Sequence, residues 1–573
     1  MSSFLTATRA SSLVILAVAW VPTCNTAKTP VRHFDAPAGI AVAPYRPEGY
    51  SAARPPLLYG FVADPGFNAI RRINLTDRGL TEPRFPVGRA LSAVVSHTGA
   101  SGVVDAIWGL DRSAGRLVRV DPAKALTPTF TAPTSSPACC TLDGITVKVA
   151  TTATETWTVT YRASLQHWDV VGSGSGVQSH FARTNAEYQA DNEAVRFFLH
   201  ANSAPSDGDS FVFSTDNGVT ESAVVNTGNG LNLVKLDDNT ALVSQDSPAQ
   251  LIAFDLGSGA PLQYFGLPAT ASPGALEVSA DSKAVYVSDL GNPVIYRLNT
   301  VGPVATWSLD TFPAPVPMRD LAATGDNGRL FAMAADADDV FVFETPDFIP
   351  VDFSALVPGF DPLRFPSTIR SLAAGRLVHG THGSGTPTWP VLLTAHGGNA
   401  YVLLGGTGCI DFNDPVGARL TGLSFRDASL PSSPKFRSDL FEANRCGGVV
   451  HTETWSFIYD GLAKVWRAKG SFSGPQVGVL TEGVPYTTDR GEITLEIDGD
   501  AGLPTDDGDT FFLTVSDGVS LTNVQLVPGK PVFYQLPPDA TGRVIERALI
   551  PNVASDSVSD VDLDNRRVVV TYR

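Results

Sequence analysis

The sequence predicts an all-β fold: a β-propeller of about seven blades that carries two inserted small β-sandwich domains. Three observations lead to this prediction. A strand–turn–strand unit recurs along the chain, its spacing is interrupted twice, and the interruptions contain two similar segments. In the 573 residues, Gly (52) and Pro (42) are also plentiful, as expected for many short strands joined by turns.

The recurring unit is a strand that ends at an acidic or polar residue, followed by a turn and a second strand. Its copies are LLYGFVADPGFNAIRRINL (57–75), DAIWGLDRSAGRLVRVDP (105–122), NTALVSQDSPAQLIAFDL (239–256), KAVYVSDLGNPVIYRLNT (283–300), GRLFAMAADADDVFVFET (328–345) and the diverged PVLLTAHGGNAYVLLG (390–405). Asp64 to Asp111 spans 47 residues and Asp246 to Asp289 spans 43. A four-stranded propeller blade occupies about 40–50 residues, so each unit is expected to form part of one blade.

A further short strand and turn precedes several units, as in GALEVSADSKA at 274–284. This order resembles the YVTN and NHL-type propellers, and the resemblance implies a fold rather than a chemistry. The last segment, DVDLDNRRVVVTYR, is expected to close the ring by pairing with the blade near residue 35, because closure removes exposed sheet edges.

Two long gaps in this spacing contain a duplicated segment. ETWTVTY at 155–161 returns as ETWSFIY at 453–459, and DGDSFVFSTDNGV at 207–219 returns as DGDTFFLTVSDGV at 507–519. Each segment is expected to form a β-sandwich or small barrel, and the DGD motif resembles hairpins of bacterial immunoglobulin-like sandwiches. The recurring residues are Glu155, Trp157, Tyr161, Trp168, Gly176 and Gln178, matched by Glu453, Trp455, Tyr459, Trp466, Gly474 and Gln476.

These patterns divide the chain into six parts. The expected parts are a signal peptide (1–24), a first group of blades (35–135), an inserted β domain (136–222), a middle group of blades (223–407), a second inserted β domain (408–524) and a closing blade (525–573).

The N-terminus has the features of a secretion signal. Arg9 precedes the apolar run SSLVILAVAW, which is too short to span a bilayer. The following VPTC resembles a bacterial lipoprotein signal, which implies lipidation of Cys24. The alternative is cleavage after Ala19 and simple secretion. Either way we expect export, to the bacterial outer membrane, the cell surface or the periplasm.

Four cysteines remain after Cys24, an even number in an oxidising compartment. Cys409 and Cys446 flank the start of the second inserted unit and are candidates for a disulfide. Cys139 and Cys140 are adjacent and are candidates for a vicinal disulfide, although the sequence leaves the pairing open. No C-x-x-C motif is present, so neither a zinc ribbon nor a thioredoxin-like site is indicated.

The repeated aromatic residues allow two interpretations. Trp157 and Trp455 are candidate binding residues of an aromatic carbohydrate platform, but large aromatics at a period of two more often form a sandwich core. Glu155 and Glu453 lie beside them. No second acid recurs nearby at a fixed spacing, so a glycosidase pair is not indicated.

The DGD turns carry candidate calcium ligands. Asp207 and Asp209 recur as Asp507 and Asp509, and carboxylate oxygens suit Ca²⁺. The alternative is that Asp and Gly simply favour turns. His379 and His382 lie three residues apart in a Gly-rich stretch that reads as a loop rather than a metal-binding helix. Calcium is therefore the one cofactor considered.

The charge balance and the missing catalytic motifs bound the function. A formal net charge of −17 argues against nucleic-acid binding. The leading hypothesis is a monomeric, non-catalytic envelope protein that binds or scaffolds protein or glycan partners and touches the membrane only through a lipid anchor. The alternative is an enzyme, such as a lactonase, hydrolase, lyase or quinoprotein, with its site at the central channel. A third hypothesis is a calcium-stabilised adhesin.

Overall fold

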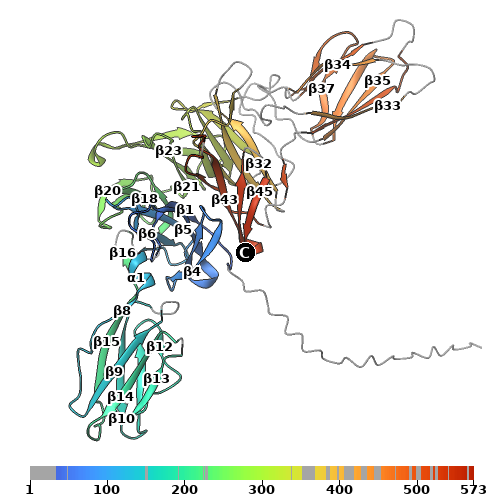
Figure 1. Cartoon of the computed structure of the whole chain (residues 1–573). Coiled ribbons are helices and arrows are strands. Elements are labelled where there is room, and N and C mark those ends of the chain that lie inside the picture. Colours follow the sequence, from blue (N-terminus) through green and yellow to red (C-terminus); the bar gives the residue numbers. More distant parts are fainter. Residues whose placement is uncertain are drawn as a thin grey trace, which may run out of the picture. The chain divides into compact units, whose positions relative to one another are not determined.

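The computed structural model describes residues 34–573 except 48, 149–152, 192, 223–224, 226–229, 337–338, 352–367, 382–386, 397–398, 406–418, 427–434, 444–452, 472, 490–492, 499–504, 517–519, 523–526, 540 and 564–566. Almost every regular element in this part is a strand (Figure 1). The exceptions are the helix α1 (Pro122–Leu126) and the 3-10 turns Pro65–Phe67, Val304–Thr306 and Val553–Ser555. No helix in the described part is long and apolar enough to cross a membrane.

Seven antiparallel sheets of the described chain form the blades of a β-propeller, so the predicted fold class is confirmed. Blade 1 contains β1 (Ile40–Tyr45), β2 (Leu57–Asp64), β3 (Ala69–Asn74) and β4 (Gly79–Pro86); blade 2 contains β5 (Ala93–Thr98), β6 (Val104–Asp111), β7 (Arg116–Val120) and β16 (Val219–Ser222); blade 3 contains β17 (Gly230–Lys235), β18 (Thr240–Asp246), β19 (Ala249–Asp255) and β20 (Pro261–Gly266); blade 4 contains β21 (Pro273–Val278), β22 (Ala284–Asp289), β23 (Val294–Asn299) and β24 (Ser308–Pro313). Blade 5 contains β25 (Met318–Ala323), β26 (Arg329–Ala334), β27 (Val340–Glu344) and β28 (Ile349–Pro350); blade 6 contains β29 (Ile369–Ala374), β31 (Pro387–Ala395), β32 (Asn399–Gly405) and β41 (Ser520–Thr522), with β30 (Gly380–Thr381) paired to β31; blade 7 contains β42 (Val532–Gln535), β43 (Glu546–Asn552), β44 (Ser557–Asp562) and β45 (Arg567–Tyr572).

The first strand of each blade lies next to the first strand of the following blade. Contacts run from β1 through β5, β17, β21, β25 and β29 to β42, and from β42 back to β1. Neighbouring blades share apolar clusters, so the middle strands are covered on both faces. All six residues of β26 are buried, which explains the apolar RLFAMA in place of strict alternation.

The ring closes differently from the sequence-based expectation. The C-terminal strand β45 pairs with β44, with Val558 opposite Tyr572 and Asp562 opposite Arg567. Blade 7 is therefore built entirely from the C-terminal segment, and blade 1 from the N-terminal one. The expected pairing with the blade near residue 35 was wrong, because β45 is the outermost strand of blade 7 and blade 1 obtains all four of its strands from residues 40–86.

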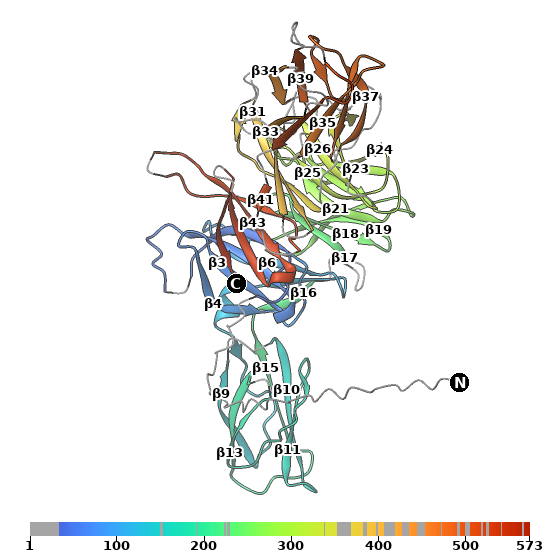
Figure 2. The same cartoon turned by 90° about the vertical axis from the view of Figure 1, so that its right-hand side faces the viewer.

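The two inserted units share one architecture of two packed sheets. The first contains β8 (Thr129–Phe130), β9 (Cys140–Val147), β10 (Glu155–Arg162), β11 (His167–Gly172), β12 (Gly176–Val177), β13 (Ala186–Gln189), β14 (Val195–Ala201) and β15 (Ser210–Asp216). The second contains β33 (Arg419–Arg426), β34 (Lys435–Ala443), β35 (Glu453–Asp460), β36 (Val465–Gly470), β37 (Gly474–Leu480), β38 (Tyr486–Thr487), β39 (Ile493–Asp498) and β40 (Thr510–Ser516). The sheet orders are β12-β11-β10-β15-β8 with β13-β14-β9, and β37-β36-β35-β40-β33 with β38-β39-β34, so every strand has its counterpart. Figure 2 shows β9 and β13 in one layer of the first unit and β10, β11 and β15 in the other.

Both units interrupt a blade at the same topological position. The first lies between β7 and β16 of blade 2, and the second between β32 and β41 of blade 6, so each separates the third strand of a blade from the fourth. The ends of the inserted units differ from the expected boundaries. The first unit begins before residue 136, because β8 belongs to it. Both units end before residues 222 and 524, because β16 and β41 belong to blades of the propeller. Strands of two to four residues are too short to show a periodicity.

Candidate functional site

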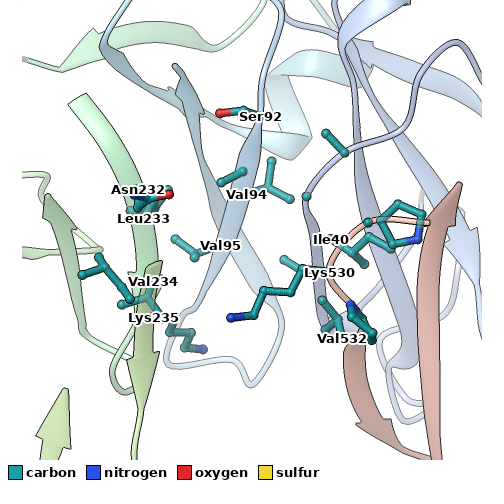
Figure 3. Close-up of a pocket in the computed structure, with 18 of the residues that line it drawn as sticks. Ile40, Ser92, Val94, Val95, Asn232, Leu233, Val234, Lys235, Lys530 and Val532 are labelled. Atoms are coloured by element: carbon teal, nitrogen blue, oxygen red, sulfur yellow. The ribbon is translucent and has the colours of Figure 1, made fainter. Parts of the chain in front are cut away.

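A cavity of about 580 Å³ lies in the centre of the propeller, between the first strands of several blades. Its wall is mainly apolar and comes from β1, β5, β17 and β21 and from the segment that leads into β42. The polar lining residues are Ser92, Ser96, Asn232, Lys235, Glu277 and Lys530. Figure 3 shows the side chain of Lys530 projecting into this space from the segment that leads into β42, with Lys235 on β17 at the other side.

Lys530 is the centre of a charged cluster. Its Nζ donates to Asp320 Oδ1 at 2.9 Å, to Glu277 Oε2 at 3.3 Å and to the Leu321 carbonyl at 3.1 Å. An ammonium group has three donors, and all three are used here. The side chain keeps 38% exposure because it crosses the open channel. The contacts connect the start of blade 7 with blades 4 and 5.

The two carboxylates are held by backbone groups as well. Asp320 Oδ2 accepts a hydrogen bond from the Leu372 N–H at 2.8 Å, and Glu277 Oε1 accepts one from Ala323 at 3.4 Å. Burial raises the pKa of Glu277, and Lys530 and Arg376 offset part of the rise. Burial alone would lower the pKa of Lys530, but Asp320 and Glu277 more than reverse this, so the pKa lies above its ordinary value. Lys530 is therefore a charged, fully engaged cation and not an amine nucleophile.

A second polar cluster joins blades 6 and 7. Glu546, at the start of β43, is almost fully buried and accepts hydrogen bonds from the Arg376 N–H at 2.7 Å and the Leu377 N–H at 3.3 Å. Its other oxygen lies 3.2 Å from His379 Nε2. Of the histidine pair proposed from the sequence, His379 thus contacts a carboxylate of the next blade, while His382 lies outside the described residues.

The structure excludes the aromatic platform. Trp157 and Trp455 are buried in the cores of their sandwiches, and Trp157 Nε1 donates to Thr215 Oγ1 at 3.3 Å. The prediction of these two residues as binding residues was wrong, because the second sheet of each sandwich covers the face on which they lie. The alternative interpretation, a sandwich core, is the one that the burial supports.

The repeated polar residues serve the hairpins of the sandwiches. Glu155 Oε2 accepts from the N–H groups of Gly174 (3.0 Å) and Ser175 (2.9 Å), and Glu453 Oε2 accepts from the Ser473 N–H at 3.0 Å. A Cβ on Gly172 would lie 2.4 Å from that Glu155 oxygen, and one on Gly470 would lie 2.4 Å from Glu453 Oε2. A side chain at either glycine would therefore collide with the glutamate, which explains why the glycine and the glutamate recur together in both copies.

The four aspartates proposed as calcium ligands accept hydrogen bonds from nearby backbone groups. Asp207 Oδ1 accepts from the Ala163 N–H at 2.8 Å, and Asp507 Oδ1 from Gly461 at 2.8 Å. Asp209 and Asp509 accept from Ser206 (2.7 Å) and Asp506 (2.9 Å). No group of three His, Cys, Asp or Glu side chains arranged to hold a metal occurs in the described part of the chain. These contacts are those of turn residues.

The vicinal pair Cys139 and Cys140 does not form a disulfide in the structure. Both thiols are free and buried, and Cys139 Sγ donates to Asp209 Oδ2 at 3.3 Å. Burial, followed by the contacts with Cys140 and Asp209, raises the pKa of Cys139 to about 12. Cys140 begins β9, whose extended backbone does not bring neighbouring sulfurs together. Cys24, Cys409 and Cys446 lie outside the described residues.

Comparisons with known proteins yield distant structural similarities only. No protein-family model matches the chain, and no curated protein does. Among solved structures, a chain of the mitotic checkpoint complex aligns with TM-score 0.30 and 9% identity over 72% of this chain and 86% of its own. Hydrazine synthase of Kuenenia stuttgartiensis aligns with TM-score 0.28 and 11% identity (66% and 99%), and the Cps50 (Swd1) β-propeller domain of Myceliophteria thermophila with TM-score 0.28 and 8% identity (64% and 95%). Similarity at this level says nothing about partners or activity.

Sequence reasoning missed the channel cluster. Lys530 lies 210 residues from Asp320 and 253 from Glu277, and no motif marks any of the three. The one local signal is that Lys530 lies two residues before the first strand of the last blade. A charged residue in that position faces the channel only because the ring is closed.

Proposed function

We propose that this protein is a non-catalytic binding and scaffolding protein of the bacterial cell envelope, which presents the surfaces of its propeller and its two inserted sandwiches to protein or glycan partners. One observation carries the proposal. The two sandwiches share their strand order, their two core tryptophans and their hydrogen-bonded turns, whereas the outward faces of their larger sheets differ.

The outward face of the first sandwich is mainly polar, with Val171, Val177 and Val212 beside Thr158. Thr156, Thr158 and Thr160 alternate with the buried residues of β10, and Ser210 and Ser214 occupy the neighbouring strand. Near its edge, the exposed Phe181 ring stacks on His167 with a centroid separation of 4.3 Å. This is a mixed polar and aromatic surface.

The outward face of the second sandwich combines exposed apolar side chains with the exposed cations Arg467 and Lys469 of β36. Ile458, in the position of Thr160, is 47% exposed, and Phe512 takes the position of Val212. Val477 and Val479 on β37 are 87% and 46% exposed. Arg467 lies between Ile458 and Val479 in the sheet, so the apolar side chains flank a cation on this face. Exposed apolar side chains rimmed by polar ones are typical of interaction surfaces. A duplicated scaffold with one strand order and two different outward faces is what two distinct binding modules would have.

The remaining parts of the proposal rest on the sequence. We propose that Cys24 is lipidated and anchors the chain, and that the inserted domains are immunoglobulin-like sandwiches. Mass spectrometry of the mature N-terminus tests the first point. A diacylglyceryl-modified Cys24 supports it, and a chain that begins after Ala19 contradicts it.

The binding function is tested with full-length protein in solution against purified envelope proteins and glycan arrays. The variant I458T/F512V places the residues of the first sandwich on the face of the second. We expect this variant to lose at least tenfold in affinity for a partner of the second sandwich, while F181V, on the first sandwich, leaves that affinity unchanged.

A catalytic result would contradict the proposal. If the pure protein turned over a sugar, ester or lactone, and substitution of Glu277 or Asp320 abolished the turnover, the channel enzyme would replace the binding protein as the best-supported function.

A further inference from the structure

A second cavity, of about 350 Å³, lies between blades 4 and 5. Its lining comes from the β21–β22 turn, the start of β22, the end of β23, and the β25–β26 and β27–β28 turns. The side chains that line it are almost all polar, and Lys283, Tyr286, Arg297, Asn299 and Asn327 can each donate hydrogen bonds. Its volume falls in the range of about 300–1,000 Å³ that is typical of small-molecule sites.

Arg297 is held rigidly at this cavity. Its Nη2 donates to Asp310 Oδ2 at 2.8 Å, and its Nη1 donates to the Pro346 carbonyl at 2.8 Å. The guanidinium also lies over the Phe312 ring, 4.9 Å from the centroid. These contacts fix the plane of the group, so little conformational entropy is lost when a ligand binds to its remaining N–H groups.

The two asparagines are oriented by their oxygens. Asn299 Oδ1 accepts from the Val301 N–H at 3.1 Å, and Asn327 Oδ1 accepts from the Ala280 N–H at 2.6 Å. Each amide therefore directs its NH₂ group away from the turn that its oxygen stabilises. In the described part of the chain, neither NH₂ has a protein partner, so both donors are available at the cavity.

The acidic residue of the cavity is already engaged. Asp281 Oδ1 accepts from Ser279 Oγ at 2.9 Å and from the Lys283 N–H at 3.2 Å, and Lys283 Nζ lies 3.1 Å from Asp281 Oδ2. Lys283 is 66% exposed and its ammonium has further donors. Lys283 and Arg297 keep Asp281 and Asp310 as ion-pair partners, so their charges are balanced within the protein. The groups still available to a ligand are mostly donors, which favours a ligand rich in hydrogen-bond acceptors, such as a carboxylate and hydroxyl oxygens.

We propose that this cavity is a binding site for an acidic sugar unit of a glycan, with its carboxylate on Lys283 and Arg297 and its hydroxyl oxygens on the amides of Asn299 and Asn327. This inference rests on the proposed binding function and specifies one glycan class for it. It does not involve the outward faces of the sandwiches, so the two proposals can fail separately.

Titration calorimetry on the full-length protein tests the site, with glucuronate, glucose and inorganic phosphate as probes. We expect glucuronate to bind at least tenfold more tightly than glucose or phosphate. K283M should weaken glucuronate binding about tenfold, and N299L should do the same. The matched control K148M removes a lysine of similar exposure from an ion pair in the first sandwich and should leave binding unchanged.

Three outcomes overturn the inference. They are the absence of glucuronate binding, equal binding of phosphate, which would indicate a simple anion site, and weakening of binding by K148M as much as by K283M. Thermal melts of all variants verify the fold. K283M replaces an exposed side chain, so we expect its melting temperature to be unchanged. N299L also removes the hydrogen bond from the Val301 N–H, so it can lower the melting temperature. In that case the binding result of K283M tests the site by itself.

Discussion

At the scale of single residues, the side chains that recur between the two sandwiches have structural roles. Gln178 donates through Nε2 to the Gly176 carbonyl (3.2 Å) and accepts through Oε1 from the Asp191 N–H (3.0 Å). Gln476 makes the same two contacts with Gly474 and Asp489, at 3.2 and 2.8 Å. Identical bonds in two copies show that the repeat preserves loop geometry.

The hairpin of the first sandwich depends on Gly172. The variant G172A would place a Cβ 2.2 Å from Ser175 Oγ and 2.4 Å from Glu155 Oε2, so the loop has to shift and loses part of its hydrogen bonding. We expect a cost of about 2 kcal/mol in the free energy of unfolding of this domain. Chemical denaturation followed by tryptophan fluorescence measures it. G266A is the control, because its Cβ meets no atom within 4 Å. Equal stability of the two variants would contradict the role assigned to Glu155.

Asp64 gives the first blade a pH-dependent stability. It is fully buried, and burial raises its pKa to about 6, although the Asp35 N–H and Arg71 partly oppose the rise. The folded chain therefore binds this proton more tightly than the unfolded chain does. As pH rises from about 4 to about 6, the group lowers the free energy of unfolding by about 3 kcal/mol, at roughly 1.4 kcal/mol for each pKa unit.

The variant D64N keeps an acceptor for the Asp35 N–H and removes the titration. Hydrogen exchange of the β2 amides between pH 4 and pH 7 should show protection, corrected for intrinsic rates, that falls with pH in the wild type and much less in D64N. Parallel profiles would show that Asp64 does not titrate in this range.

At the scale of elements, blade 7 is attached to the ring by side chains as well as by strand packing. It shares no strand with blade 1. Within the described residues, β42 contacts β1 and β29, and no sheet hydrogen bonds connect these strands. Lys530 reaches blades 4 and 5, and Glu546 binds the backbone of blade 6. These polar contacts join segments that are far apart in sequence and so support ring closure.

K530M should loosen the last blade. It leaves Glu277 and Asp320 without their shared cation, and since a hydrogen bond to a charged group contributes about 1.5–3 kcal/mol, we expect local destabilisation of about 2 kcal/mol. Hydrogen exchange of β42 and β43 amides reports it. K235M is the control, because Lys235 also lines the channel but pairs with the largely exposed Asp238. We expect K235M to lower the local stability by less than about 1 kcal/mol. Equal effects would show that Lys530 contributes no more than a surface pair.

At the scale of the whole molecule, each inserted sandwich has its own core, separate from the clusters between the blades. W455A should therefore destabilise one domain selectively. Truncation of a buried Trp costs about 3–5 kcal/mol, and calorimetry should show one transition moved to lower temperature while the propeller transition stays in place. The exposed neighbour T454A is the control. A joint shift of all transitions would show that the propeller and the sandwich unfold together.

The sequence was sufficient for most of the fold but for little of the candidate sites. The blade spacing, the duplication and the insertion points follow from residues that are neighbours in the chain. Alternation places Trp157 and Glu155 on one face of a strand, yet it does not say which face a second sheet covers. That is why the aromatic platform remained an alternative until the packing excluded it.

The sequence by itself determined the local features of this protein: strands, turns, the repeat unit of the blade and the presence of two copies of one inserted domain. These features depend on backbone preferences and on short-range periodicity, and both can be read from residues that are close together in the sequence. Only the tertiary structure decided how the ring closes, which residues meet in the channel and how the donors of the cavity between blades 4 and 5 converge. Lys530 and Asp320 are 210 residues apart, and closure of the ring, not any spacing in the chain, brings them to 2.9 Å.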